Sequence, residues 1–243
     1  MRIPTLLSAL VLTFATPAHA LTSMPVTACG DVVPRGTIGY LTADLDCTGL
    51  GLIASVYLQP GGRLELRGFT ITGSILGVSC HFLRGDPPRL YSGSGSCRID
   101  GGGGRIAASD AHGVSGHNLL IRNLTIDGVG QEGVHADAKA RLTNVTITNS
   151  GGVGVAARGA NLENTTVTGS GEHGVGAQNI RMTGSTVTGN GTNTTECDGN
   201  LFPDRCADLL SEKRPRLKDS VCGTSLVPVR VFPPQSWHVC QSD

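Results

Sequence analysis

One sequence pattern is written four times between Leu119 and Cys197, and it constrains the fold more than any other feature. The copies read Leu120-Ile-Arg-Asn-Leu-Thr-Ile-Asp, Arg141-Leu-Thr-Asn-Val-Thr-Ile-Thr, Asn161-Leu-Glu-Asn-Thr-Thr-Val-Thr and Arg181-Met-Thr-Gly-Ser-Thr-Val-Thr. Equivalent apolar residues follow one another at intervals of 21, 20 and 20 positions, at Ile126, Ile147, Val167 and Val187. Self-similarity at a fixed period of about 20 residues is typical of a solenoid in which each copy forms one rung.

Apolar residues alternate with threonine inside each copy, as at Val145, Thr146 and Ile147. This period of two is typical of a strand with one buried face, and no stretch shows helical spacing. Three short strands fit into each copy, with only a few residues left for each turn. The sequence therefore predicts an all-β fold: a single-stranded parallel β-helix whose rungs stack about 4.8 Å apart.

Asparagines occupy the same place in three copies, at Asn123, Asn144 and Asn164, and Gly184 takes that place in the fourth. Asn and Gly are the residues that most readily adopt the left-handed backbone of a tight bend. We expect these asparagines to form a structural ladder, in which stacked amides hydrogen-bond from rung to rung.

The sequence divides into four segments. Residues 1–20 are typical of a signal peptide, with Arg2, an apolar run from Leu6 to Ala15 and an Ala18-His-Ala20 cleavage site. We expect an N-terminal cap and first coil over 21–60, parallel β-helix rungs over 61–197, and a Cys-rich C-terminal cap over 198–243. A secreted or periplasmic protein with no membrane span follows, because no later apolar stretch is long enough.

Eight cysteines follow the signal segment, which is typical of an oxidising compartment. They allow 105 pairings, but contacts in a solenoid are mostly local, so sequential pairing is favoured. A structural zinc site is disfavoured because no Cys-x-x-Cys pair exists, and we expect no metal-binding residues in the chain, apart from Ca²⁺ ligands if the protein is a lyase. The expected pairs are Cys29 with Cys47, Cys80 with Cys97, Cys197 with Cys206, and Cys222 with Cys240.

Charge and aromatic content argue against nucleic acid as a partner. The chain has 19 basic and 19 acidic residues and only 4% aromatic residues, so it lacks the strongly basic character of most nucleic-acid-binding proteins. A polysaccharide is the partner that the next observations favour.

The repeat resembles the right-handed parallel β-helices of the pectin-lyase-like superfamily over about residues 60–197. The resemblance rests on the Asn column, the 20-residue period, Leu66-Arg-Gly-Phe-Thr-Ile-Thr-Gly and the recurring Gly-Val-x-Ala. The opening Cys29-Gly-Asp segment also looks like the cap of secreted bacterial members. The superfamily includes pectate lyases, polygalacturonases, alginate lyases and epimerases, phage depolymerases and proteins without assigned chemistry, so it indicates a fold and not an activity.

The resemblance implies that a sugar polymer would lie along the outer face of the strand that begins with Gly-Val. Counting outward positions from the valines places Glu132, His135, Asp137 and Arg158, together with His112, in one patch on three rungs. These four residues are the candidate catalytic residues: the carboxylates would hold Ca²⁺ against a uronate, and His135 or Arg158 would act as the base. The alternative is an exposed charge ladder without chemistry.

The sequence departs from the enzymes of the superfamily, and this favours a non-catalytic role. Glu172 precedes His173 where polygalacturonases have Gly-His-Gly, and neither an Asp-Asp pair nor an Arg-x-Lys element occurs. We expect a structural, surface-associated or glycan-binding module without a cofactor. The alternative is a small lyase or hydrolase acting on a uronate-containing polymer, with Ca²⁺ if it is a lyase. A metal carrier is disfavoured by three methionines and the absence of a His-rich tract.

Overall fold

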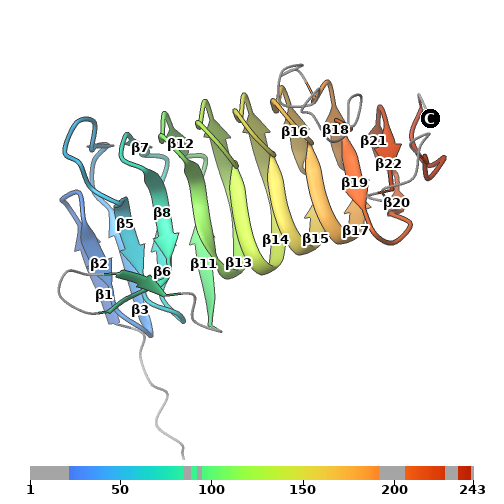
Figure 1. Cartoon of the computed structure of the whole chain (residues 1–243). Helices are drawn as coiled ribbons and strands as arrows, with labels where there is room; N and C mark the ends of the chain where they lie inside the picture. The colour runs from blue at the N-terminus through green and yellow to red at the C-terminus, as the bar shows by residue number, and fades with distance from the viewer. Residues whose placement is uncertain (1–21, 85–88, 92–94, 192–205, 228–234, 242–243) are drawn as a thin grey trace, which may run out of the picture.

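The computed structural model describes residues 22–84, 89–91, 95–191, 206–227 and 235–241. These residues contain no helix, and twenty strands form one long sheet with parallel pairing between successive rungs. The strands stack from the blue N-terminal end to the red C-terminal end (Figure 1). The predicted all-β, parallel, solenoid-like architecture is therefore confirmed.

The strand pairings form three ladders that run the length of the stack. The first ladder passes through the beginnings of the long strands. It comprises β2 (Asp31–Val33), β5 (Ala54–Leu58), β8 (Leu76–Cys80), β13 (His112–Asp127), β14 (Val134–Thr148), β15 (Val155–Glu163), β17 (Val175–Thr183), β19 (Leu209–Ser211) and β22 (Ser225–Leu226).

The second ladder continues along β13, β14, β15 and β17 after a bend in each. Its other members are β1 (Thr22–Val26), β3 (Thr37–Leu41), β6 (Arg63–Glu65), β11 (Ser96–Asp100) and β20 (Arg216–Lys218).

The third ladder takes in the ends of β13 and β14. Its other members are β4 (Leu45–Asp46), β7 (Thr70–Thr72), β12 (Arg105–Ala107), β16 (Thr166–Thr168), β18 (Thr186–Thr188) and β21 (Val221–Cys222).

One hairpin lies outside the ladders. β9 (Phe82–Arg84) and β10 (Arg89–Tyr91) pair antiparallel between Cys80 and Cys97. The sequence predicted a loop or distorted rung at this place.

The core consists mainly of aliphatic columns that continue from rung to rung in each ladder. The first-ladder valines Val114, Val134, Val155 and Val175 are fully buried, and the third-ladder residues Ile126, Ile147, Val167 and Val187 are equally buried. The alternation of apolar residues with threonine therefore produces the expected inward and outward faces.

The asparagine column lies at the bend between the second and third ladders. Asn123, Asn144, Asn164 and Gly184 have φ angles of 52°, 54°, 47° and 57°. The Asn144 amide donates to Oδ1 of Asn123 at 3.1 Å, and the Asn164 amide donates to Oδ1 of Asn144 at 3.3 Å. The side-chain amide of each of these two asparagines therefore donates a hydrogen bond to the asparagine of the preceding rung.

Disulfides join neighbouring cysteines, as sequential pairing requires. The structure contains Cys29–Cys47, Cys80–Cys97 and Cys222–Cys240. Cys206 is also disulfide-bonded, and Cys197, its expected partner, lies outside the described residues. These bonds indicate an extracellular or otherwise oxidising compartment.

The predicted signal peptide and the predicted absence of a membrane span both bear on where the protein is located. The proposed signal peptide, residues 1–20, lies outside the described residues. In the part of the chain that is described, no helix is long and apolar enough to cross a bilayer.

Candidate functional site

In the central rungs, glycine precedes the buried first-ladder valine because the next rung lies too close for a side chain. A Cβ on Gly113 would lie 2.7 Å from the carbonyl oxygen of Gly133, and one on Gly133 would lie 2.7 Å from that of Gly154. This close stacking brings the side chains on either side of each glycine near those of the adjacent rungs.

A β-bulge follows in β14. The register shifts between Ala136 and Lys139, so Asp137 and Ala138 together occupy the space that His117 fills on β13. This extra residue accounts for the 21-residue interval in the repeat. Bulges redirect side chains, and Asp137 lies at this one.

Three predicted patch residues meet on β13, β14 and the turn before β14. Nδ1 of His112 lies 2.5 Å from Oε2 of Glu132. The rings of His112 and His135 stack, with centroids 5.0 Å apart and planes inclined by 21°. Nδ1 of His112, Oε2 of Glu132 and Nδ1 of His135 are all buried without a hydrogen bond of regular geometry.

Asp137 lies among three imidazoles. Its carboxylate oxygens are 3.7 Å from Nε2 of His135, 3.8 Å from Nδ1 of His117 and 3.8 Å from Nε2 of His81. We call His81, His112, His117, His135, Glu132 and Asp137 the histidine–carboxylate cluster. Its donor set does not match Ca²⁺, which prefers oxygen ligands throughout, because imidazoles surround both carboxylates.

Arg158 is the one predicted site residue that the structure does not bring into this cluster. It is exposed on β15, and among the described residues it forms no ion pair within 4.0 Å with Glu132 or Asp137. The hypothesis of a lyase with Arg158 as its base therefore gains no support from this geometry and stays a prediction.

His81 is the cluster member that sequence reasoning missed. A usable signal existed, because Gly77-Val78-Ser79-Cys80-His81 and Gly113-Val114-Ser115-Gly116-His117 are identical at four of their five positions. The β9–β10 hairpin separates these two copies by 36 residues, which conceals the shared register. Pairing of Val78 with Val114 aligns the two copies in the structure.

Burial and charge act in opposite directions within the cluster. The adjacent His112 imidazole holds the pKa of Glu132 below its ordinary value, and this outweighs partial burial, which raises it. Burial lowers the pKa of His81, and the nearby Asp137 carboxylate only partly opposes this. Glu132 therefore stays ionised and His81 stays neutral near pH 7.

A second charged feature lies on the second ladder. Arg141, Asn161, Arg181 and Arg216 occupy one outward column on β14, β15, β17 and β20. The column continues toward the N-terminus through Leu120 to Arg98 and Arg63. Lys139 lies two residues before Arg141, in a column with Gly159 and Asn179.

Two adjoining hollows lie along this column. One, of about 320 Å³, is lined by Lys139, Arg141, Asn161, Asn179 and Arg181 with intervening small residues. The other, of about 430 Å³, is lined by Asn179, Ile180, Arg181, Lys213, Arg214, Pro215 and Arg216. Because both include Asn179 and Arg181, they form one shallow groove, which we call the basic groove.

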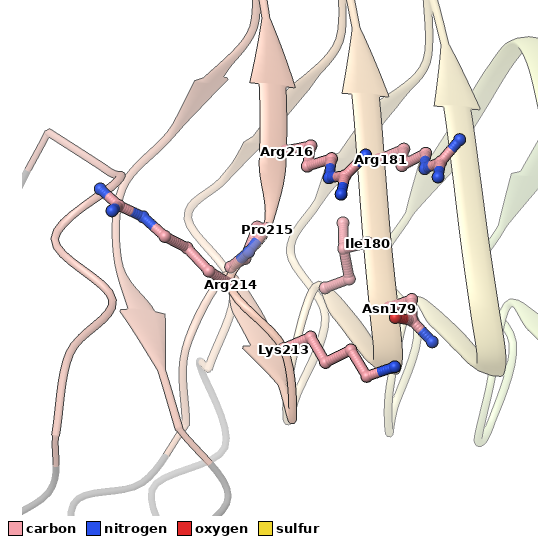
Figure 2. A pocket seen from close by; sticks show the side chains of 7 residues that line it. All are labelled: Asn179, Ile180, Arg181, Lys213, Arg214, Pro215 and Arg216. Carbon is pink, nitrogen blue, oxygen red and sulfur yellow. The ribbon is translucent and has the colours of Figure 1, made fainter.

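Figure 2 shows how the cations of the second hollow lie. Arg181 and Arg216 extend beside one another from neighbouring strands, and Lys213 reaches toward Asn179. Arg214 points away from them. The basic groove therefore presents the charges of Lys139, Arg141, Arg181, Lys213 and Arg216.

These five cations lack the carboxylate partners that other arginines have. Arg67 pairs with Glu65, Arg105 with Asp127, and Arg122 with Asp100. Within the described residues, no ion pair involves any of the five groove cations. Glu163 on β15 is an acidic neighbour, one column away between Thr143 and Thr183.

Comparison with protein-family models, with curated proteins and with solved structures finds no match in any of the three.

Proposed function

We propose that this protein is a secreted right-handed parallel β-helix, similar in fold to the pectin-lyase-like superfamily, that binds a uronate-containing polysaccharide along its basic groove. The observation that carries the proposal is the group of five exposed cations on β14, on β17 and at β20, none of which has an ion-pair partner among the described residues. Disulfide bonding fits a compartment in which such polymers occur.

The spacing of the groove suits a linear anionic polymer. Neighbouring strands of a ladder are about 4.8 Å apart, so the groove from β14 to β20 is about 14 Å long and matches a short run of pyranose units. Arg141 and Arg181 lie two rungs apart, with the amide of Asn161 between them. Arginine forks bind carboxylates in a bidentate manner, and the amides of Asn161 and Asn179 are suited to sugar hydroxyls.

Recognition would be chiefly electrostatic. None of the described residues that line the two hollows is aromatic, so these residues offer no stacking partner to a sugar ring. Exposed ion pairs are each worth about 0.2–1 kcal/mol and weaken as salt screens them. We therefore expect modest affinity that depends on several contacts together.

The test measures binding of the disulfide-bonded protein to polygalacturonate and alginate by calorimetry at low and moderate salt, with a neutral glucan as the control polymer. Arg181→Gln and Arg141→Gln should each weaken binding roughly fivefold, or about 1 kcal/mol. Arg35→Gln is the matched variant, because Arg35 is an exposed arginine at the turn before β3, away from the groove.

Binding to the acidic polymers that fails to fall with salt, or that Arg181→Gln leaves unchanged, would contradict the proposal. Tighter binding to single-stranded DNA of equal length would assign the groove to phosphate backbones instead. Turnover of either polymer that requires Arg158 would favour the alternative of a lyase or hydrolase.

A further inference from the structure

Three side chains with metal-binding atoms converge on the outer surface of the first ladder. His112, Glu132 and His135 each offer one ligand atom, and these atoms all lie within 4.8 Å of one another. We propose that they form a site for one first-row transition-metal dication, with Zn²⁺ as the best fit. This site is separate from the basic groove, which lies on the second ladder, and does not depend on the proposed glycan binding.

Three buried polar atoms at this place are suited to bind a cation. Nδ1 of His112, Oε2 of Glu132 and Nδ1 of His135 are buried and have no hydrogen-bond partner of regular geometry. Buried polar atoms without partners are costly and uncommon. An ion pair between His112 and Glu132 satisfies two of the three atoms and leaves His135 unexplained. A metal ion satisfies all three.

The separation of the ligand atoms suits a small dication. Zinc bonds of about 2.0–2.2 Å place the ligands of a tetrahedral site roughly 3.3–3.6 Å apart. The ligand atoms here span at most 4.8 Å, and Nδ1 of His112 lies 2.5 Å from Oε2 of Glu132. Small side-chain rotations of the three residues, each 20–38% exposed, bring both values into range. Three protein ligands leave one position for water or another ligand.

The kind of donor selects the class of metal. Two imidazoles with one carboxylate suit Zn²⁺ and its transition-metal neighbours, whereas Ca²⁺ and Mg²⁺ prefer oxygen ligands alone. One carboxylate charge would partly neutralise the dication.

Asp137 lies where it can position the imidazole ring of His135. Metal-binding histidines usually direct their second ring nitrogen to a carboxylate, which fixes the tautomer and the ring orientation. Nε2 of His135, the ring nitrogen other than the orphaned Nδ1, lies 3.7 Å from Oδ1 of Asp137. The bulge in β14 thus brings Asp137 to the side of His135 that the metal does not use.

The experiment uses the disulfide-bonded protein, stripped with EDTA and titrated with Zn²⁺ against a chromophoric chelator. We expect one equivalent to bind. Replacing the Zn²⁺ with Co²⁺ should give the intense visible absorption of a four- or five-coordinate site. Co²⁺ bound to a single surface histidine does not produce this absorption. Zn²⁺ should also raise the Tm of the wild-type protein, because it binds only the folded state tightly.

The variants separate ligands from neighbours. His112→Gln, His135→Gln and Glu132→Gln should each weaken Zn²⁺ binding roughly 100-fold or more, and Asp137→Asn should weaken it about 10–100-fold. His238→Gln, which alters an exposed histidine of the C-terminal segment, is the control and should bind as the wild type does. No stoichiometric Zn²⁺ binding by the wild type, or unchanged affinity in His135→Gln, would overturn the proposal.

Discussion

At the scale of single residues, the asparagine column shows one side chain meeting two demands. Asn144 adopts a φ of 54° and links two rungs, donating to Asn123 and accepting from Asn164. Glycine meets only the first demand, as at Gly184, whose φ is 57°. Alanine meets neither, because its Cβ disfavours the left-handed region.

Asn144→Ala should therefore lower the free energy of unfolding by about 2 kcal/mol, and Asn144→Gly by only about 1 kcal/mol. The difference between the two variants isolates the backbone conformation from the amide hydrogen bonds. Urea unfolding with the disulfides intact measures both. Equal losses in the two variants would mean that the φ angle contributes nothing.

Most of the residue-scale pattern could be predicted from the repeat alone. The alternation of apolar residues with threonine gave the inward columns, and the Asn and Gly positions gave the bend. The geometry of the candidate site could be predicted less fully from the sequence. Counting outward positions placed His112, Glu132, His135 and Asp137 on one face, but it could not give the 2.5 Å approach of His112 to Glu132. Such distances depend on rotamers and on the bulge, which no periodic rule specifies.

At the scale of elements, the stacking distance between rungs decides which positions tolerate a side chain. A Cβ on Gly154 would lie 2.6 Å from the carbonyl oxygen of Gly174 and 2.8 Å from Oγ of Ser170. A Cβ on Gly159, in the same strand region, would meet only Cγ of Lys139 at 3.8 Å. The next rung therefore leaves no room for a side chain at Gly154, whereas a side chain at Gly159, five residues later, has room.

Gly154→Ala should destabilise the protein by about 1–3 kcal/mol, since its contacts are with backbone and core atoms that cannot move freely. Gly159→Ala should change stability by less than about 0.5 kcal/mol, because the only contact is the flexible side chain of Lys139. Thermal unfolding of both proteins compares them directly. A larger loss in Gly159→Ala would show that the close contact between rungs does not govern the Gly-Val position.

The order of the strands also explains why the sequence did not predict His81 as a member of the cluster. The hairpin of β9 and β10 interrupts the repeat after β8, and the 36-residue interval between equivalent glycines is not a multiple of the rung length. An insertion on the surface of a solenoid leaves the stacking intact while it breaks the sequence period. A search for repeats of fixed length therefore loses the rung that carries His81, although its five-residue motif is nearly identical to the next one.

At the scale of the whole molecule, the two charged features occupy different ladders of one scaffold. The histidine–carboxylate cluster lies along the first ladder, on β13 and β14 with His81 just after β8 and Glu132 just before β14, and the basic groove crosses β14 to β20 of the second. The overall charge near zero concealed this separation. Equal totals of acidic and basic residues do not reveal that Arg67, Arg105 and Arg122 have carboxylate partners, whereas the groove cations have none among the described residues.

The distribution of lysines offers the most direct test of the proposed polymer-binding face. The chain contains three lysines, Lys139, Lys213 and Lys218. Lys139 and Lys213 line the two hollows of the basic groove, whereas Lys218, equally exposed at the end of β20, lines neither. Acetylation rates of the three amines, followed by mass spectrometry with and without polygalacturonate, require no variant and contain their own control. Bound polymer should slow acetylation of Lys139 and Lys213 several-fold and leave Lys218 nearly unchanged. Equal slowing of all three lysines, or protection of Lys218 alone, would contradict binding along the groove.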